Sequence, residues 1–186
     1  MAQFEFETTP LAGLIAVQRR AHGDERGFLS RIYCVERFAE AGLRLSLAQI
    51  NHTLTRRSGT VRGMHYQRPP CAEAKFVSCL RGEIFDVAVD LRRGSPTFLK
   101  WHADILSAAN HRSLLIPAGF AHGFQALTDD CELLYLHTAA YEPAAEGGLN
   151  PADPRLSVRW PLDVVAMSDR DRSHPLLTAA FDGLDL

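Results

Sequence analysis

Short apolar runs of strand length, separated by turn-forming sequences, constrain the fold of this chain more than any other feature. Residues 82–91 (GEIFDVAVDL) alternate, with Phe85, Val87 and Val89 on one face, and their β-branched content is typical of a strand. The pattern continues with runs at 112–117 (RSLLIP) and 131–138 (CELLYLHT), and with turn sequences at 92–96, 107–111, 117–120 and 128–130. Short strands at this spacing, with almost no helix, predict an all-β antiparallel sandwich or jelly roll.

Helices are expected to be few and short. Residues 35–43 (VERFAEAGL) have apolar side chains at helical spacing, and Gly42 suits the left-handed position that ends a helix. The segment from about Pro151 onward is rich in Pro and Asp, and we expect it to wrap the barrel before a short terminal helix. Without an internal repeat or a low-complexity linker, residues 1–186 are predicted to form a single domain.

The composition excludes several classes of function. A formal net charge of −2 gives no overall field that would attract nucleic acid or an anionic membrane, so neither is expected as a partner. The first residues carry acids where a signal peptide carries bases, and no apolar run reaches membrane length. Four cysteines without CxxC spacing are typical of reduced, mostly buried thiols. We therefore expect a cytoplasmic protein in which any anion binding is local.

Three basic or titratable side chains, Arg62, His65 and Lys75, gather in the strand-like stretch SGTVRGMHYQRPPCAEAKF. They are either an ordinary solvated edge or a set of charges that converges on an anionic substrate. Arg62 precedes Gly63, where backbone can approach a ligand closely, and an arginine fork suits phosphate oxygens. No glycine-rich phosphate loop is present, so side chains would have to hold a nucleotide.

Tyr135 and His65 each have a structural and a catalytic interpretation. Tyr135 is either a core ring whose hydroxyl finds one partner or a phenol in a barrel cavity that donates a proton. A single strand histidine is more often structural, but His65 would serve as a general base if a carboxylate held its ring. Asp169 and Asp171 are candidates for that carboxylate, although nothing local in the sequence brings them near residue 65.

The sequence IPAGFAHGF, which contains His122, is similar to the second half of the cupin metal motif. The first half normally offers His-x-His and then a Glu, but here the stretch is HYQ, with Gln67 in place of the second histidine. Glu73 and Lys75 follow, and a lysine ammonium would oppose a divalent cation. We therefore expect neither a metal nor another cofactor.

Six motifs occur in order and at matching spacing: GTVRGMHYQ, GEIFDVAVDLRRGSPTF, LLIPAGFAHGF, LLYLHT, YEPAAEGG and RWPL. Together they resemble the dTDP-4-dehydrorhamnose 3,5-epimerase family, across roughly residues 4–177. The resemblance implies a metal-free, cupin-like jelly roll that is homodimeric and acts on a nucleotide-diphosphate 4-keto-6-deoxysugar. In this chemistry the C4 ketone acidifies the hydrogens at C3 and C5. A base removes one to give an enolate, and a proton returns to the opposite face.

The resemblance also implies roles for individual residues. His65 matches the base, Asp171 the carboxylate paired with it, and Tyr135 the proton donor. Lys75 matches the lysine near the ketone oxygen, and with Arg62 it would stabilise the enolate. The residues that match further substrate contacts are His122, the basic residues Arg26 and Arg170 on the diphosphate side, the polar residues Gln49, Asn51 and Glu146, and Tyr141, whose ring stacks on the base.

Three positions depart from the family pattern. Arg31 stands where the family usually has a nucleotide-contacting Glu, and Pro151 and Ala152 replace a Trp and an Asp. The catalytic set is retained while parts of the binding surroundings change. We therefore expect the nucleotide preference, rather than the reaction, to differ, and we count Arg31 among the substrate-binding residues.

Alternative functions remain at this point. Epimerisation at C3 alone, rather than at C3 and C5, depends on how long the sugar is held. A 3,4-ketoisomerase on the same scaffold, a non-catalytic nucleotide-sugar-binding cupin and a metal-dependent cupin oxygenase are the other possibilities. A strand-rich fold with exposed edges is often protected by pairing, which agrees with a homodimer.

Overall fold

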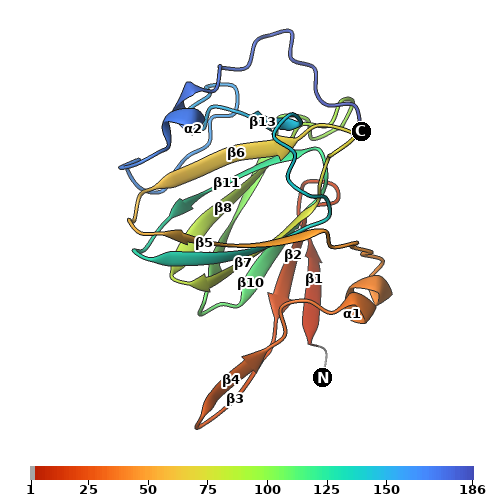
Figure 1. The fold of residues 1–186 in the computed structure, drawn as a ribbon, viewed down its shortest axis with the longest axis vertical. Helices are drawn as coiled ribbons and strands as arrows, with labels where there is room; N and C mark the ends of the chain where they lie inside the picture. Colours follow the sequence, from red (N-terminus) through yellow and green to blue (C-terminus); the bar gives the residue numbers. More distant parts are fainter. Residues whose placement is uncertain (1–2) are drawn as a thin grey trace.

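Two antiparallel sheets lie face to face in the computed structural model, which describes residues 3–186 (Figure 1). The six-stranded sheet has the order β1 (Phe4–Thr8), β2 (Ile15–Arg19), β10 (Arg112–Ile116), β7 (Lys75–Arg81), β12 (Cys131–His137) and β5 (Gln49–Thr55). The five-stranded sheet has the order β13 (Glu146–Gly148), β6 (Val61–Gln67), β11 (Phe120–Ala126), β8 (Glu83–Asp90) and β9 (Trp101–Ser107). Neighbouring strands are mostly not consecutive in the chain, and the predicted all-β antiparallel jelly roll is confirmed.

Burial on both faces explains why the central strands are so apolar. In β8, Ile84 and Ala88 point into the core between the sheets, whereas Val87 and Val89 point to a second core outside. The same holds for β12, where Leu133 belongs to the core between the sheets. A strand covered on both sides reads as a nearly continuous apolar run.

The helix expected near residue 35 is α1 (Val35–Glu40). It ends as predicted, because Gly42 adopts a left-handed φ of 79° and the Leu43 amide donates to the carbonyl of Phe38. Phe38 is fully buried and meets the ring of Phe76 edge-on at a centroid distance of 5.3 Å. This short helix therefore covers the apolar core on one face of the six-stranded sheet.

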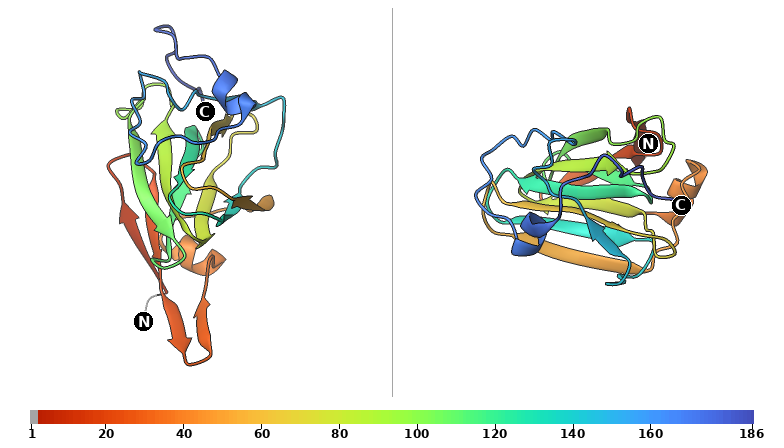
Figure 2. Two further views of the ribbon diagram at one scale, coloured as in Figure 1. Left: turned by 90° about the vertical axis from the view of Figure 1, so that its left-hand side faces the viewer. Right: turned by 90° about the horizontal axis from the view of Figure 1, so that it is seen from above.

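The segment after Pro151 wraps the outer face of the five-stranded sheet, as predicted (Figure 2). Leu156 is buried there, and the indole of Trp101 donates to its carbonyl oxygen at 2.9 Å. The expectation of a terminal helix is wrong in position. The short helix α2 (Asp169–Ser173) is followed by irregular chain, because the residue before a proline disfavours helical backbone and Pro175 follows His174.

A two-stranded hairpin, β3 (Ala21–Asp24) and β4 (Gly27–Ser30), projects away from the two sheets (Figures 1 and 2). Its apolar side chains Phe28 and Leu29 are 67% and 66% exposed. No helix within residues 3–186 is long and apolar enough to cross a membrane.

Candidate active site

A polar cavity of about 230 Å³ lies between the two sheets. The walls come from β5, β6, β7, β11, β12 and β13, with Arg170 from α2 and with Glu73 and Tyr141 from the connecting loops. The predicted site residues that line it are Asn51, Arg62, His65, Lys75, His122, Tyr135, Tyr141, Glu146 and Arg170. Side chains from distant parts of the chain therefore meet at one place, as the anionic-substrate interpretation of Arg62, His65 and Lys75 requires.

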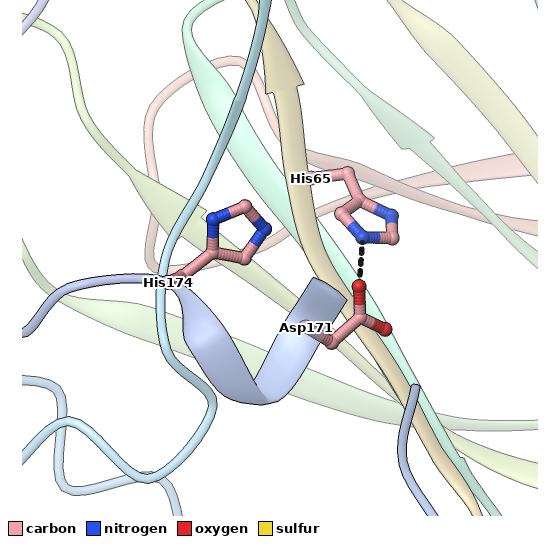
Figure 3. Close-up of side chains that lie close together, drawn as sticks. All are labelled: His65, Asp171 and His174. Atoms are coloured by element: carbon pink, nitrogen blue, oxygen red, sulfur yellow. Dashed lines mark hydrogen bonds and ion pairs between the residues drawn. The ribbon is translucent and has the colours of Figure 1, made fainter. Parts of the chain in front are cut away.

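His65 of β6 forms a close pair with Asp171 of α2 (Figure 3). The ring Nε2 lies 2.7 Å from Asp171 Oδ1, while Oδ2 accepts a hydrogen bond from the Gly63 amide at 3.1 Å. Burial raises the pKa of Asp171, but the hydrogen bonds from His65 and Gly63 outweigh it and lower the pKa to about 2. The carboxylate is thus ionised at neutral pH and can only accept, so Nε2 of His65 carries the proton and donates to it. Arg170 Nη2 lies 3.1 Å from the same Nε2, but it too can only donate, so this contact is not a hydrogen bond in that tautomer.

This tautomer leaves Nδ1 of His65 with a lone pair. Nδ1 has no hydrogen-bond partner among residues 3–186, and the ring lines the cavity. A histidine held by a carboxylate through one nitrogen is oriented to take a proton with the other. His65 therefore has the geometry of a general base.

Next to the pair, the backbone of β6 packs closely against β11. Gly63 has a φ of 125°, and a Cβ atom there would lie 2.5 Å from the Cα atom of Gly123. Only glycine fits such a position, and its buried amide supplies the bond to Asp171. Ser168 caps α2 by accepting from the Asp171 amide at 3.0 Å, which fixes the backbone that carries the carboxylate.

Tyr135 of β12 lines the same cavity from the six-stranded sheet. Burial raises the pKa of its phenol well above the usual value, as does the nearby carboxyl group of Asp86. The phenol is therefore protonated and available as a donor. Its ring lies edge-on to His122 at a centroid distance of 5.8 Å and stacks on His137 at 5.9 Å.

His122 of β11 forms a second histidine–carboxylate pair with Asp86 of β8. The His122 Nε2 and Asp86 Oδ1 atoms lie 2.7 Å apart, and both side chains are buried. The other carboxyl oxygen, Oδ2, is buried without a hydrogen-bond partner among residues 3–186. His122 presents its ring to the cavity from this fixed position.

Lys75, at the start of β7, is buried in the cavity wall. Its Nζ lies 3.1 Å from Glu73 Oε1 and donates to the backbone carbonyl of His65 at 3.1 Å. An ammonium group has three donors, so one remains for a ligand. Arg62 is more exposed, and its Nη1 contacts the hydroxyl of Thr55 at 3.4 Å.

The polar residues at the cavity mouth are linked to one another. Tyr141 donates its hydroxyl to Glu146 at 2.9 Å, and Arg170 binds the same carboxyl oxygen at 3.0 Å. Gln49 lies beside the cavity rather than on its wall, and its amide donates to Asn51 at 3.1 Å. These residues form a hydrogen-bonded rim around an exposed aromatic ring.

A second hollow of about 570 Å³ adjoins the cavity on the side of Arg62, His65 and Arg170. Arg56 and Arg57, both exposed, also line it. Positive charge is therefore concentrated around His65 although the whole chain carries a formal net charge of −2.

Arg26 and Arg31 do not reach the cavity in the single chain. Arg26 lies at the tip of the β3–β4 hairpin and pairs with Asp24, while Arg31 donates to Gln3 at 2.5 Å. Their binding roles, like the roles of the other site residues, stay predictions.

Two cavity residues, Glu73 and His137, were missed as functional candidates, together with Asp86 behind His122. The oxygen Glu73 Oε2 lies 3.0 Å from His137 Nδ1. The signal for His137 was available, because it shares a strand face with Tyr135 and that face lines the cavity.

The group of possible metal ligands in the described chain is His65, Asp171 and His174, whose ligand atoms lie within 4.8 Å of one another (Figure 3). His65 and Asp171 are already hydrogen-bonded to each other. The guanidinium Nη2 of Arg170 lies 3.1 Å from Nε2 of His65, and its positive charge would oppose the binding of a cation. The expectation of a metal-free site stays a prediction. Burial and the nearby His65 lower the pKa of His174, which favours its neutral form.

Comparison with known proteins adds an independent finding. The family model of dTDP-4-dehydrorhamnose 3,5-epimerase matches residues 8–179. A dTDP-4-dehydrorhamnose 3,5-epimerase from Pseudomonas aeruginosa is 46% identical over 86% of this chain and 88% of its own length. A dTDP-4-dehydrorhamnose 3-epimerase from Streptomyces niveus is 41% identical over 92% of this chain and 83% of its own.

A solved structure shows the same likeness in three dimensions. The dTDP-4-dehydrorhamnose 3,5-epimerase from Bacillus anthracis, determined with TDP and PPi bound, superposes with a TM-score of 0.91 at 37% identity. The match covers 94% of this chain and 99% of that one.

Proposed function

The chain belongs to the dTDP-4-dehydrorhamnose 3,5-epimerase family, and from this premise we propose that it inverts C3 and C5, or C3 alone, of a nucleotide-diphosphate 4-keto-6-deoxyhexose. Membership makes the protein an isomerase of the epimerase type. The proposal extends this to the substrate class and to the residues that carry the reaction.

The observation that carries the proposal is the placement of a base and an acid on opposite walls of one cavity. His65, backed by Asp171, comes from the five-stranded sheet, and Tyr135 comes from the six-stranded sheet. Nδ1 of His65 removes the acidified proton next to the ketone. The phenol of Tyr135 returns a proton to the other face of the sugar, which inverts the carbon.

Cations stabilise the enolate between these two steps. Removal of the proton places negative charge on the C4 oxygen, and Lys75 has one N–H donor that is not used by the protein. Arg62 on the neighbouring wall adds a second positive charge. The sugar loses one proton to His65 and gains one from Tyr135, and exchange with solvent water then deprotonates His65 and reprotonates Tyr135, which balances the reaction.

The rim and the basic hollow are proposed to hold the nucleotide diphosphate. Arg62 and Arg170 lie where guanidinium groups can bind phosphate oxygens, and the exposed ring of Tyr141 offers a face on which a base can stack. Asn51 and Glu146 supply polar contacts beside it.

A homodimer is proposed to complete the site. Strand β5 forms an edge of the six-stranded sheet, and its side chains Ile50 and Leu54 are 61% and 41% exposed. The projecting hairpin exposes Phe28 as well. Pairing of two copies would cover these surfaces and would give the hairpin residues Arg26 and Arg31 a route to the partner's cavity. The cytoplasmic location predicted from the sequence stays a prediction.

A 3-epimerase is the second candidate, because one relative of 41% identity is named as such. The two are separated by incubating the enzyme in deuterated water with 4-keto-6-deoxyglucose linked to dTDP, CDP, GDP or UDP, followed by NMR. Deuterium at C3 and C5 is expected for the 3,5-epimerase, and deuterium at C3 alone for the 3-epimerase. Absence of label with every nucleotide would overturn the proposed function and would leave the ketoisomerase and the binding protein.

A further inference from the structure

A chain of hydrogen bonds runs from Tyr141 at the cavity mouth to Lys75 in the cavity wall. The Tyr141 amide donates to Gln49 Oε1 at 3.0 Å, and Gln49 Nε2 donates to Asn51 Oδ1 at 3.1 Å. Asn51 Nδ2 lies 3.4 Å from His137 Nε2, and His137 Nδ1 lies 3.0 Å from Glu73 Oε2. The other oxygen of Glu73 lies 3.1 Å from Lys75 Nζ.

The backbone amide at one end fixes the direction of every bond in this chain. A backbone N–H can only donate, so Gln49 must present its oxygen to Tyr141 and its NH₂ group to Asn51. Asn51 then presents its own NH₂ group to His137, which must accept at Nε2 and donate from Nδ1 to Glu73. One arrangement of protons therefore satisfies all the members.

The lysine end of the chain is buried and charged. The side chains of Glu73 and Lys75 are 7% and 9% exposed, and that of His137 is 11% exposed. Burial raises the pKa of Glu73, but the hydrogen bond from His137 and the charge of Lys75 outweigh it, so the pKa lies below its usual value. An ionised carboxylate thus holds two donors, one on each oxygen.

This arrangement fixes the ammonium group of Lys75 in one place. Glu73 and the backbone carbonyl of His65 take two of its three protons, so the third points to the remaining space, which is the cavity. The second contact also ties the ammonium to the strand that carries the base. Base and electrophile are therefore held at a constant separation.

We propose that Glu73 and His137 are positioning residues that aim the Lys75 ammonium at the C4 oxygen of the sugar. The inference rests on the proposed function, because it assumes that Lys75 stabilises the enolate. In this proposal both residues act through Lys75, and the stacking of the His137 ring on Tyr135 is a separate contact that the comparison with the Glu73 variants distinguishes.

The chemistry of the side chains defines three informative variants. In Glu73→Gln one oxygen becomes an NH₂ group, which must face either His137 Nδ1–H or Lys75, and two donors then oppose each other. His137→Leu removes both of its hydrogen bonds. His137→Gln keeps a donor for Glu73 and an acceptor for Asn51, so it is the conservative variant that should restore function.

The test is steady-state kinetics with the nucleotide-sugar that wild type turns over. Because a misplacement of about 1 Å can cost about 10²-fold in rate, we expect Glu73→Gln and His137→Leu to lower kcat by roughly 10-fold to 100-fold, with KM within about twofold. His137→Gln should recover most of the loss. In a Lys75→Met background, Glu73→Gln should change kcat by less than about twofold, because both residues act as one unit.

A matched control pair lies outside the cavity and joins β5 to β12, as the contact between Asn51 and His137 does. His52 of β5 and Glu132 of β12 lie 3.0 Å apart, and their side chains are 56% and 30% exposed. His52→Leu and Glu132→Gln should leave kcat unchanged. Thermal unfolding of every variant separates loss of rate from loss of fold, and His137→Gln against His137→Leu decides the matter if Glu73→Gln does not fold.

The outcomes distinguish a failure of this inference from a failure of the proposed function. Wild-type kcat in Glu73→Gln and His137→Leu would overturn this inference and leave the proposed function intact. An equal loss of kcat from Glu73→Gln with and without Lys75 would also overturn it, because the effect would not pass through the lysine. Absence of turnover by wild type with every nucleotide would instead overturn the proposed function.

Discussion

The two histidine–carboxylate pairs of this site have the same contact distance and different surroundings. In each, a ring Nε2 lies 2.7 Å from a carboxyl oxygen. The side chain of His65 is 29% exposed and both oxygens of Asp171 are bonded, whereas the side chain of His122 is 6% exposed and Asp86 Oδ2 has no partner among the described residues.

Because the two pairs share one contact distance but differ in exposure, pair geometry alone does not assign a catalytic role. A base needs a free nitrogen with access to substrate and a carboxylate that stays ionised. The pair on β6 and α2 has both, since the pKa of Asp171 is lowered to about 2. The pair on β11 and β8 is instead part of the packed wall, so its first effect is on the fold and on the placement of the substrate.

The largest expected effect is on the rate of proton exchange between substrate and solvent, which should differ between variants of the two pairs. His65→Asn should reduce incorporation of solvent deuterium at C3 and C5 by about 10³-fold to 10⁴-fold, because general-base catalysis contributes up to about 10⁴-fold. His122→Asn should retain exchange at a lower rate. The measurement is NMR in deuterated water, and near-normal exchange in His65→Asn would show that the base is another residue.

The effects on unfolding free energy should be in the opposite order, with a larger loss for the His122 variant than for the His65 variant. His122→Ala leaves the fully buried Asp86 without a partner, which costs about 3–5 kcal/mol of unfolding free energy. His65→Ala leaves Asp171 with its bond from Gly63, so we expect a loss of about 1 kcal/mol. Urea unfolding monitored by fluorescence measures both, and a larger loss for His65→Ala would contradict the assignment of roles.

Tyr135 is connected with both pairs. Its ring contacts His122 of the buried pair, and its hydroxyl is proposed to return the proton after His65 has removed one. Tyr135→Phe should leave enolate formation, and hence exchange, partly intact while it lowers completed inversion by about 10²-fold. The ratio of exchanged substrate to inverted product, followed by NMR, reports this. Equal loss of both quantities would place Tyr135 in the first step as well.

The acid stability of the protein should depend on Asp171. Its pKa in the folded state, about 2, is below the ordinary aspartate value of 3.8, so the ionised form stabilises the fold above about pH 4 and this contribution disappears as the pH falls toward 2. A shift of this size corresponds to about 2 kcal/mol. The stability difference between wild type and Asp171→Asn should therefore shrink between about pH 4 and pH 2. A constant difference over that range would mean that the carboxylate is not stabilised by the fold.

The smallest effect concerns neither pair. Arg31 lies on the hairpin side of the molecule, so Arg31→Glu should leave exchange at His65 nearly unchanged and alter the preference among nucleotides by about tenfold, equal to about 1.4 kcal/mol. Comparison of kcat/KM for dTDP-, CDP-, GDP- and UDP-linked substrates tests this. Equal changes for all four would remove Arg31 from nucleotide recognition.

Local patterns were sufficient for much of the fold. Alternation in residues 82–91 and 131–138 predicted β8 and β12, and Gly42 marked the end of α1 correctly. The helix expected at the end of the chain is α2, which ends before Pro175 and is followed by irregular chain. Secondary-structure propensity and apolar periodicity are local properties of a few residues. They were sufficient for β8, β12 and the end of α1 because these elements do not depend on residues far away in the sequence.

The site was predicted less completely because its contacts are non-local. Asp171 was a candidate partner for His65, but the two are separated by 106 residues, and only the resemblance to the family paired them. The pair of Glu73 and His137 depends on the register between β12 and β7, which places His137 opposite Lys75. Strand pairing of this kind is not encoded in any single stretch of the chain.

The same separation has a consequence for the order in which the protein is made. A ribosome that has added His65 must add 106 further residues before Asp171 exists, and the tail that carries α2 can cover the five-stranded sheet only after that sheet has formed. A nascent or truncated chain can therefore build most of the cavity while His65 remains without its carboxylate partner. Enzymatic turnover thus reports the last docking event of folding, and it serves as a more demanding assay of native structure than strand content does.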